Sequence, residues 1–335
     1  MKKLDVGVIG VGGIAKARHL PFLRTISSVN LKALSDIKFS SSDLLVYPKQ
    51  HLYTDYTMML DREKLNLVDI CTPPHGHVEQ CVDSINAGCD ILVEKPFTLT
   101  LDECDKVLET ATNKERKVCV MHSSLFFPSM MRAVKRLSEI GTMDSIRILF
   151  DAPIRFLEAK WIKEMPAGIM DECMPHVAYI LNAFVSPKNS HVYRSKNTIS
   201  GNEHCTIIFD SYVPCLVDIN FGMDWEFRVF IEGSKKSMQI DILNQFFSIK
   251  NNRNIPRNKI GVFRNLSGRV FSDIGQIFSN VNASFKPFGH EYVIREYVSY
   301  LLGNERSPPV SFNDIREVVR ITQMVNSQFV NAKIT

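Results

Sequence analysis

Short apolar runs alternate with segments of helical periodicity through the first third of this 335-residue chain. This alternation constrains the fold strongly, because a strand–helix–strand unit brings each strand back parallel to the one before it. It predicts a doubly wound parallel sheet with right-handed crossovers. We expect strands at Asp5–Gly10, Leu31–Ser35, Leu67–Thr72, Asp90–Lys95 and Lys117–His122, and helices at Ala15–Ile26, Val78–Ala87 and Leu101–Ala111.

The pattern changes after His122. Alternating apolar runs follow two helical segments, as expected of antiparallel strands joined by short loops, and two amphipathic helices close the chain. We predict two domains, a Rossmann-type α/β domain at residues 1–122 and an α+β domain with a mainly antiparallel open sheet at 123–335; residues 251–290 give no clear pattern. The expected helices are Ser129–Glu139, Cys173–Phe184, Glu291–Leu302 and Asp314–Gln328, and the strands include Thr206–Phe209, Leu216–Phe221, Phe227–Glu232 and Ser237–Ile242.

Composition narrows the class of function. The 45% hydrophobic and 23% charged residues are typical of a soluble globular protein. The 40 basic and 36 acidic residues form no long basic block, so no nucleic-acid partner is predicted. No apolar run reaches the roughly 18 residues of a membrane helix. Asp5 and Gly7 interrupt any signal peptide, and the eight cysteines show no ligand spacing. We expect a cytoplasmic protein with no metal site and no membrane partner.

A glycine-rich turn, Gly10–Ala15, lies between the first expected strand and the first helix. Its pattern G-x-G-x-x-A in this context is typical of dinucleotide binding. Gly10 would make the tight turn, and Gly12, with Gly13 and Ile14 beside it, would let a pyrophosphate approach the helix N-terminus. The alternative is a glycine-rich turn that binds no ligand.

Asp36 ends the second expected strand, where an acid can accept hydrogen bonds from the adenosine ribose. This favours NAD over NADP. Lys38 and Ser35 could instead lie beside a 2′-phosphate, so NADP stays open, and a simple turn residue is a further alternative.

The run Ile91–Phe97 ends abruptly in Glu94-Lys95-Pro96, and proline cannot continue a central strand. A charged residue at the carboxyl end of a parallel strand lies where open α/β sheets bind ligands, so Lys95 is a candidate for chemistry. The alternative on this stretch alone is a surface lysine at a strand exit. Thr72-Pro73-Pro74 fixes an extended exit from another strand, and His77 then begins a helix. Taken alone, His77 is more typical of a capping or solvent-exposed residue than of a catalyst.

Together these motifs resemble the Gfo/Idh/MocA family, the relatives of glucose–fructose oxidoreductase and inositol dehydrogenase. The resemblance implies that Glu94-Lys95-Pro96 faces the nicotinamide, with Lys95 as the catalytic lysine. It also implies that the open sheet of the second domain forms a homo-oligomer interface, in a dimer or a tetramer. The motifs are Gly10–Ala15, Tyr53-Thr54-Asp55-Tyr56, Thr72-Pro73-Pro74-x-x-His77, Ala87-Gly88 and Glu94-Lys95-Pro96, and the cofactor contacts they imply are Gly10, Gly12, Gly13, Ile14, Asp36, Thr72, Pro73, His77, Glu94 and Lys95.

The family's Asp-x-Gly-x-His pattern aligns with residues 172–176, with His176 as the histidine and Glu172 as the acid. Met174 stands where relatives have glycine, and Asp171 is a rival for the acid. Leu125 also stands where relatives often have arginine. A surface i, i+4 pair of Glu172 and His176 is the alternative.

The resemblance thus implies a nicotinamide-dependent oxidoreductase that transfers a hydride to or from a carbinol or carbonyl carbon of a sugar, nucleotide sugar or cyclitol. Burial beside a cationic ring would lower the pKa of Lys95, which could polarise the substrate oxygen while His176 exchanges the proton and Glu94 positions Lys95. The alternative function is a dinucleotide-sensing regulator without turnover.

Overall fold

The computed structural model describes residues 3–153, 159–196, 202–222, 224–251 and 288–333. The chain divides into two compact units, the first made of residues 1–123 and 289–323 and the second of residues 124–288 and 324–335. Residues 289–323, which the sequence analysis placed in the second domain, therefore pack within the first unit. Helix α11 (Phe312–Asn331) contributes to both units. Most of the segment 251–290 lies outside the described residues.

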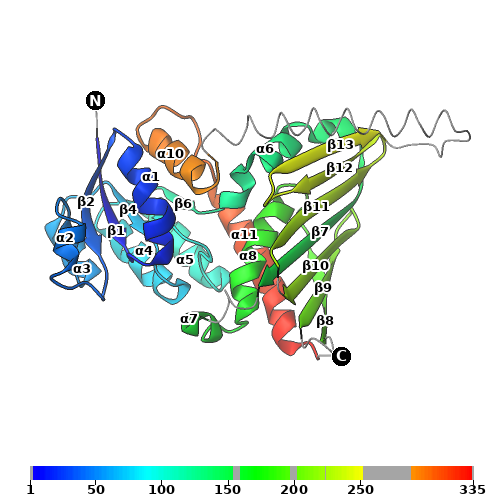
Figure 1. Ribbon diagram of the computed structural model, residues 1–335, viewed down its shortest axis with the longest axis horizontal. Helices are drawn as coiled ribbons and strands as arrows, with labels where there is room; N and C mark the ends of the chain where they lie inside the picture. The colour runs from blue at the N-terminus through cyan, green and yellow to red at the C-terminus, as the bar shows by residue number, and fades with distance from the viewer. Residues whose placement is uncertain (1–2, 154–158, 197–201, 223, 252–287, 334–335) are drawn as a thin grey trace, which may run out of the picture. The chain divides into compact units, whose positions relative to one another are not determined.

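The first unit contains the expected doubly wound sheet, with six parallel strands in the order β3-β2-β1-β4-β5-β6 (Figure 1). Helices α4 and α5 pack against each other, and η1 and α1 pack with α10. The strands are β1 Leu4–Ile9, β2 Val29–Ser35, β3 His51–Tyr53, β4 Leu67–Ile70, β5 Asp90–Val93 and β6 Val118–Val120. The helices are η1 Ala15–His19, α1 Leu20–Thr25, α2 Asp43–Val46, α3 Tyr56–Arg62, η2 Pro74–Gly76, α4 His77–Asn86, α5 Leu101–Asn113 and α10 His290–Leu301.

The register of these strands brings their carboxyl ends into one row. Ile9 pairs with both Ser35 and Ile70, and Ile70 pairs with Val93. The next residue along each strand is Gly10, Asp36, Cys71 or Glu94, so these four residues follow the same edge of the sheet. Strand order reverses direction between β1 and β4, which is where open α/β sheets bind ligands.

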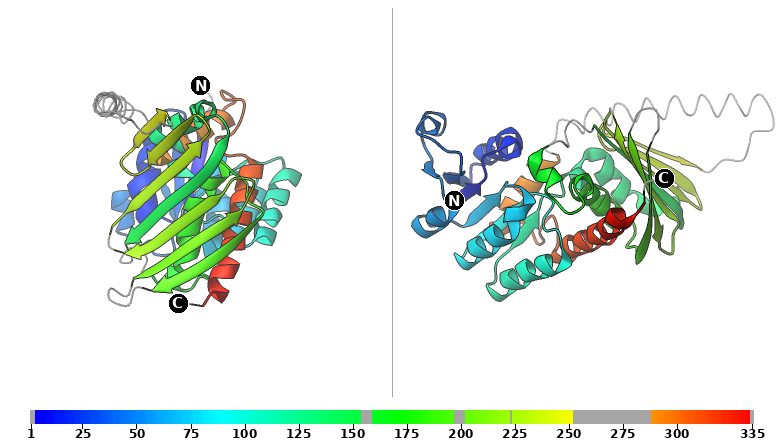
Figure 2. Two further views of the ribbon diagram at one scale, coloured as in Figure 1. Left: turned by 90° about the vertical axis from the view of Figure 1, so that its right-hand side faces the viewer. Right: turned by 90° about the horizontal axis from the view of Figure 1, so that it is seen from below.

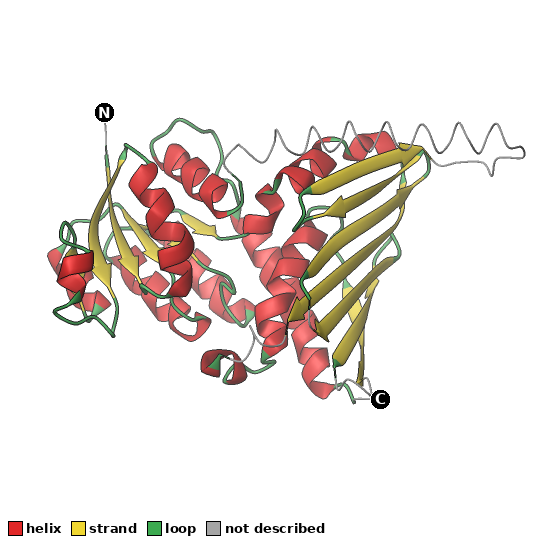
Figure 3. Cartoon of the chain, in the orientation of Figure 1, coloured by secondary structure: helices red, strands yellow, loops and turns green. Residues whose placement is uncertain are grey.

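The second unit contains a seven-stranded sheet in the order β13-β12-β11-β7-β10-β9-β8. Strands β7 and β10 are parallel and the other neighbours are antiparallel, which confirms a mainly antiparallel sheet. Helices α6 and α8 contact the same face of this sheet (Figures 2 and 3). The strands are β7 Met143–Pro153, β8 Asn189–Lys196, β9 Glu203–Asp210, β10 Cys215–Gly222, β11 Glu226–Gly233, β12 Lys236–Asp241 and β13 Phe246–Asn251, and the helices are η3 Ser123–Phe126, α6 Pro128–Lys135, η4 Leu137–Ile140, α7 Lys160–Lys163 and α8 Ile169–Asn182.

The sequence analysis missed β7, which is the strand that joins β11 to β10. Its sequence alternates, with Ile146, Ile148, Phe150 and Ala152 buried. The helix expected at Cys173–Phe184 begins earlier than predicted. Helix α8 starts at Ile169, before Pro175, and its first turn is held by Asp171, whose Oδ2 accepts a hydrogen bond from the Ala167 N–H at 2.6 Å. In the described part of the chain, no helix is long and apolar enough to cross a bilayer.

Candidate active site

The turn after β1 is shaped by its glycines. Gly10 has φ +85°, and a Cβ on it would meet Thr72 at 2.8 Å (Cγ2) and 2.9 Å (backbone N), so only glycine lets β1 and β4 end this close together. Gly12 and Gly13 are exposed, and nothing lies within 4 Å of a Cβ built on either. The turn therefore offers open space at the start of a helix, where a pyrophosphate fits.

A π-helical turn follows the glycines. The helix runs without interruption from residue 13 to residue 25, but within it the Leu20 N–H donates to the Ala15 carbonyl, five residues back. Such a turn changes which side chains face inward, and it is often found at functional sites. Here His19, the last residue of η1, is fully buried.

Asp36 joins the ends of β1 and β2. Its Oδ2 accepts a hydrogen bond from the Val11 N–H and its Oδ1 accepts one from the Lys38 N–H, both at 2.8 Å. The carboxylate thus lies against the glycine turn. A carboxylate has further lone pairs, so this position fits hydrogen bonding to a ribose hydroxyl as well.

His77 ties together the loops that follow β4 and β5. Its Nδ1 lies 2.8 Å from the Pro96 carbonyl and its Nε2 lies 2.8 Å from the Thr72 carbonyl. Burial lowers the pKa of His77, so the neutral ring donates its single N–H to one of these carbonyls at a time. Both ring nitrogens therefore face main-chain carbonyls. A direct contact between His77 and the cofactor stays a prediction.

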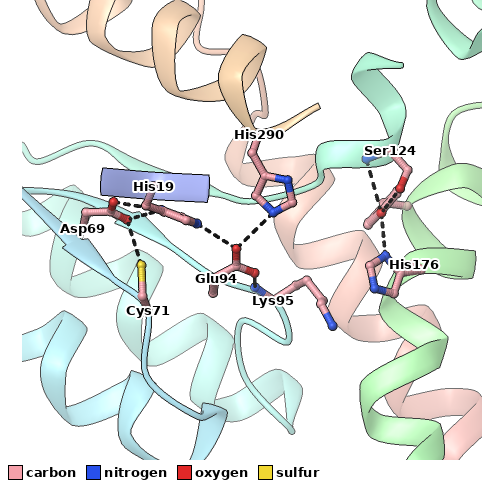
Figure 4. Close-up of polar contacts among 9 residues, drawn as sticks. His19, Asp69, Cys71, Glu94, Lys95, Ser124, His176 and His290 are labelled. Atoms are coloured by element: carbon pink, nitrogen blue, oxygen red, sulfur yellow. Dashed lines mark hydrogen bonds and ion pairs between the residues drawn. The ribbon is translucent and has the colours of Figure 1, made fainter. Parts of the chain in front are cut away.

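Glu94 fixes the turn that carries Lys95. Its Oε2 accepts the Lys95 N–H at 3.0 Å, and its Oε1 lies 2.8 Å from Nε2 of His19 and 3.3 Å from Nε2 of His290 (Figure 4). Burial opposes ionisation of this carboxyl group, but hydrogen bonds from the two histidines and the charge of His19 outweigh it and hold the pKa of Glu94 well below its usual range. Glu94 is therefore a carboxylate directly before Lys95.

His19 bridges two buried acids. Its Nδ1 lies 2.8 Å from Oδ2 of Asp69, on β4, while its Nε2 faces Glu94. Burial disfavours the charged ring, but attraction to Asp69 outweighs this and the pKa of His19 is raised well above its ordinary value. The Cys71 thiol lies 3.7 Å from Asp69, and burial raises its pKa to about 12. The thiol is therefore neutral beside this ion pair.

The second unit holds His176 in a hydrogen-bonded chain. The Tyr179 hydroxyl donates to Oγ of Ser124 at 2.9 Å, and it lies 2.7 Å from Nδ1 of His176. Because that hydroxyl has given its only proton to Ser124, Nδ1 of His176 is the donor in their bond. The ring also stacks on Phe150. Nδ1 of His176 is therefore committed to Tyr179, and a role of His176 in proton exchange stays a prediction.

The two candidate acids of this unit differ in what they bind. Asp171 is buried, with one oxygen on the Ala167 N–H and the other accepting from Nδ2 of Asn326 at 2.7 Å. Both oxygens brace the start of α8. Glu172 is half-buried and follows it on the same helix. Which of the two acids takes part in the site stays a prediction.

The predicted site residues thus lie in both units. The first unit brings together the glycine turn, Asp36, the Thr72–His77 loop, Glu94 and Lys95, and the second unit holds Glu172 and His176. Sequence reasoning missed His19, Asp69 and His290. Their partners lie far away along the chain, and only the packing of η1 and α10 in the first unit reveals the network.

Comparison with known proteins agrees with this geometry. Residues 4–122 match the model of an oxidoreductase family with an NAD-binding Rossmann fold, GFO_IDH_MocA. The match covers about a third of the chain and lies within the first unit. The family match includes the glycine turn, Asp36 and the Glu94–Lys95 turn.

Two known proteins are similar to this chain over part of their length. D-glucoside 3-dehydrogenase of Escherichia coli is 29% identical over 110 residues, which cover 32% of this chain and 31% of the relative. Alpha-N-acetylgalactosaminidase of Shewanella oneidensis is 31% identical over 132 residues, or 36% of this chain and 28% of the relative. The matched region therefore spans about a third of each of these proteins.

The fold extends the likeness beyond the Rossmann domain. The WlbA dehydrogenase of Bordetella pertussis, solved with NADH and UDP-GlcNAcA, superposes with a TM-score of 0.72. The match covers 98% of this chain and 96% of that one, at 14% sequence identity. Both units thus share the architecture of that enzyme.

Proposed function

We propose that this protein is a nicotinamide-dependent oxidoreductase that transfers a hydride to or from a carbinol or carbonyl carbon. The observation that carries the proposal is the Lys95 turn. It lies beyond β5 in line with the glycine turn, with its N–H held by Glu94 and the Pro96 carbonyl within reach of His77. A lysine held this firmly at the cofactor edge of a Rossmann sheet is suited to act on a substrate oxygen.

Each residue has a defined part in this mechanism. A bound nicotinamide supplies the carbon that gives or accepts the hydride. The turn at Gly12 and Gly13 receives the pyrophosphate, the Lys95 ammonium polarises the substrate oxygen, and Nε2 of His176 takes or returns the proton. Positioned acid–base groups of this kind typically contribute about 10²–10⁴-fold each.

Asp36 supports NAD rather than NADP. Its carboxylate lies 2.8 Å from the Val11 N–H, beside the position expected for the adenosine ribose. A 2′-phosphate at that point would meet a negative charge. We therefore infer NAD as the cofactor, with NADP bound more weakly.

The proposed substrate is a sugar, a nucleotide sugar or a cyclitol. This rests on the D-glucoside 3-dehydrogenase relative and on the fold shared with a dehydrogenase that binds UDP-GlcNAcA. We further propose a cytoplasmic homo-oligomer, a dimer or a tetramer, that associates through the seven-stranded sheet. That sheet carries polar side chains, including Arg147 hydrogen-bonded to Asp218, which suit a specific interface.

The test is turnover of Lys95→Ala and His176→Ala with a panel of sugars, nucleotide sugars and cyclitols, with NADH binding measured alongside. We expect both variants to bind NADH and to lose about 10²-fold or more in kcat. Wild-type turnover in both variants would contradict the assignment. A regulator without turnover, the alternative function, would bind NADH but convert no member of the panel.

A further inference from the structure

His290 reaches the Lys95 turn from a part of the chain that carries none of the site motifs. It begins α10, and its Nε2 lies 3.3 Å from Oε1 of Glu94. Its ring also meets the His19 ring edge-on, with the centroids 5.8 Å apart. His290 is thus the third donor facing the Glu94 carboxylate, after Nε2 of His19 and the Lys95 N–H.

The network is fully hydrogen-bonded and ionic. Glu94 is ionised, because hydrogen bonds from the two histidines and the charge of His19 hold its pKa well below the usual range, and the His19 ring lies between Glu94 and Asp69. His290 is the histidine that solvent can reach, because its side chain is 21% exposed whereas that of His19 is fully buried. The His290 ring therefore faces the negative charge of Glu94, the residue that accepts the hydrogen bond from the Lys95 N–H.

A hydrogen-bonded network accounts for the geometry of His19, Glu94 and His290 better than a metal ion does. Single ligand atoms of His19, Glu94 and His290 lie within 4.8 Å of one another. Ligands bound to zinc at about 2.0 Å in a tetrahedron lie roughly 3.3 Å apart. The 2.8 Å between His19 and Glu94 is shorter than this and is a normal length for a charge-assisted hydrogen bond.

We propose that His290 is a positioning residue for Lys95, acting through Glu94. Its Nε2–H holds Oε1 of Glu94, so that Oε2 stays aimed at the Lys95 N–H. The role assigned to Lys95 rests on the proposed function. The positioning itself is a property of the protein without substrate.

The first test is the NMR spectrum of the uniformly ¹⁵N-labelled, substrate-free protein. His290→Phe keeps a ring against His19 but removes the donor, whereas His290→Gln keeps an N–H donor. We expect the phenylalanine variant to shift the Lys95 amide signal and the His19 Nε2–H signal, and the glutamine variant to restore both. His51→Ala is the matched control, because His51 also binds a carboxylate of this unit, Oε1 of Glu63 at 2.6 Å, away from Lys95.

The second test is turnover. With a substrate from the panel above, His290→Phe should lower kcat about tenfold, the rate equivalent of one charge-assisted hydrogen bond, without changing NADH binding. His290→Gln should restore most of the rate. Thermal unfolding is followed in each variant, and His290→Leu replaces the phenylalanine variant if the latter does not fold.

Two results would overturn the proposal. One is a Lys95 amide signal in His290→Phe identical to that of the wild type. The other is stoichiometric Zn²⁺ binding by the wild-type protein that shifts both histidines, because the network would then be a metal site. If the amide signal shifts but the wild-type protein converts no substrate, the positioning stands and the proposed function fails.

Discussion

At the scale of single residues, the site depends on which atoms of its histidines carry protons. His176 donates from Nδ1 to Tyr179, and His19 donates from both nitrogens to buried carboxylates. The His19 ring therefore holds a charge between two carboxylates, and Nε2 of His176 is the atom that the proposed proton exchange would use. These roles come from the neighbours of each ring rather than from the residue type.

Tyr179→Phe should change the tautomer of His176. Without the hydroxyl, Nδ1 loses its acceptor, and the ¹⁵N imidazole signals should show a larger population with the proton on Nε2. We expect kcat to fall about tenfold with NADH binding unchanged. Tyr212→Phe is the control, since Tyr212 is 85% exposed in the same unit. Identical imidazole signals in Tyr179→Phe and the wild type would refute this role.

His19→Ala should destabilise the protein strongly, because it leaves Asp69 and Glu94 buried without their shared partner. Breaking a buried ion pair in this way typically costs about 3–5 kcal/mol of unfolding free energy. Urea unfolding would measure the loss. His51→Ala should cost about 1 kcal/mol or less, because the His51 side chain is 65% exposed and Glu63 keeps its contacts with Tyr53 and Lys32.

The same network should give the stability a maximum in mildly acidic solution. The pKa of His19 is raised by folding, so its contribution is complete below about pH 6.5 and is lost as the pH rises through the folded value. The pKa of Glu94 is lowered, so its contribution is present above about pH 4.3 and is lost as the pH falls towards the folded value. In urea unfolding below about pH 4.3 and above about pH 6.5, His19→Ala should flatten both slopes. Unchanged slopes would contradict the network.

At the scale of elements, the two glycines of the first turn have separable tasks. Gly10→Ala forces a positive φ on alanine and a clash with Thr72, so we expect a loss of about 1–3 kcal/mol in stability. Gly12→Ala meets no atom of the protein and should change stability by less than about 0.5 kcal/mol. Its methyl group would nevertheless fill the space proposed for the pyrophosphate.

Thermal unfolding and NADH titration of the two variants test this separation. Gly12→Ala should bind NADH about tenfold more weakly at normal stability. If Gly12→Ala binds NADH as tightly as the wild type, the turn is not the pyrophosphate site.

Elements with strong local patterns were predictable from the sequence. The apolar runs of β1, β4 and β5 and the glycine turn between β1 and η1 specify the parallel sheet and its ligand edge. The π-turn before α1 and the start of α8 were not predictable. The π-turn carries His19, which binds Asp69 and Glu94, and Asp171 at the start of α8 also binds Asn326. These partners lie far away along the chain and leave no local periodicity.

At the scale of the whole molecule, each unit is made of two segments that are far apart in the sequence. Residues 289–323 return to the first unit and supply His290, although they follow the second sheet in sequence. A domain boundary drawn from the order of the chain alone places these residues with the second sheet. The motif residues were found because each lies at a strand end, whereas the network behind Lys95 exists only once the unit has closed.

In the proposed function, a hydride passes directly between the substrate carbon and the cofactor at the Lys95 edge of the sheet. This transfer is tested by incubating the wild-type protein and Lys95→Ala with NAD⁺ and fully carbon-deuterated sugars, nucleotide sugars and cyclitols, followed by mass spectrometry of the NADH. We expect the wild type to form NADH with one deuterium at C4 of the nicotinamide. Lys95→Ala should form this product at no more than about a hundredth of the wild-type rate. NADH without deuterium, or no NADH from any of these compounds while NAD⁺ is bound, would contradict the proposed function.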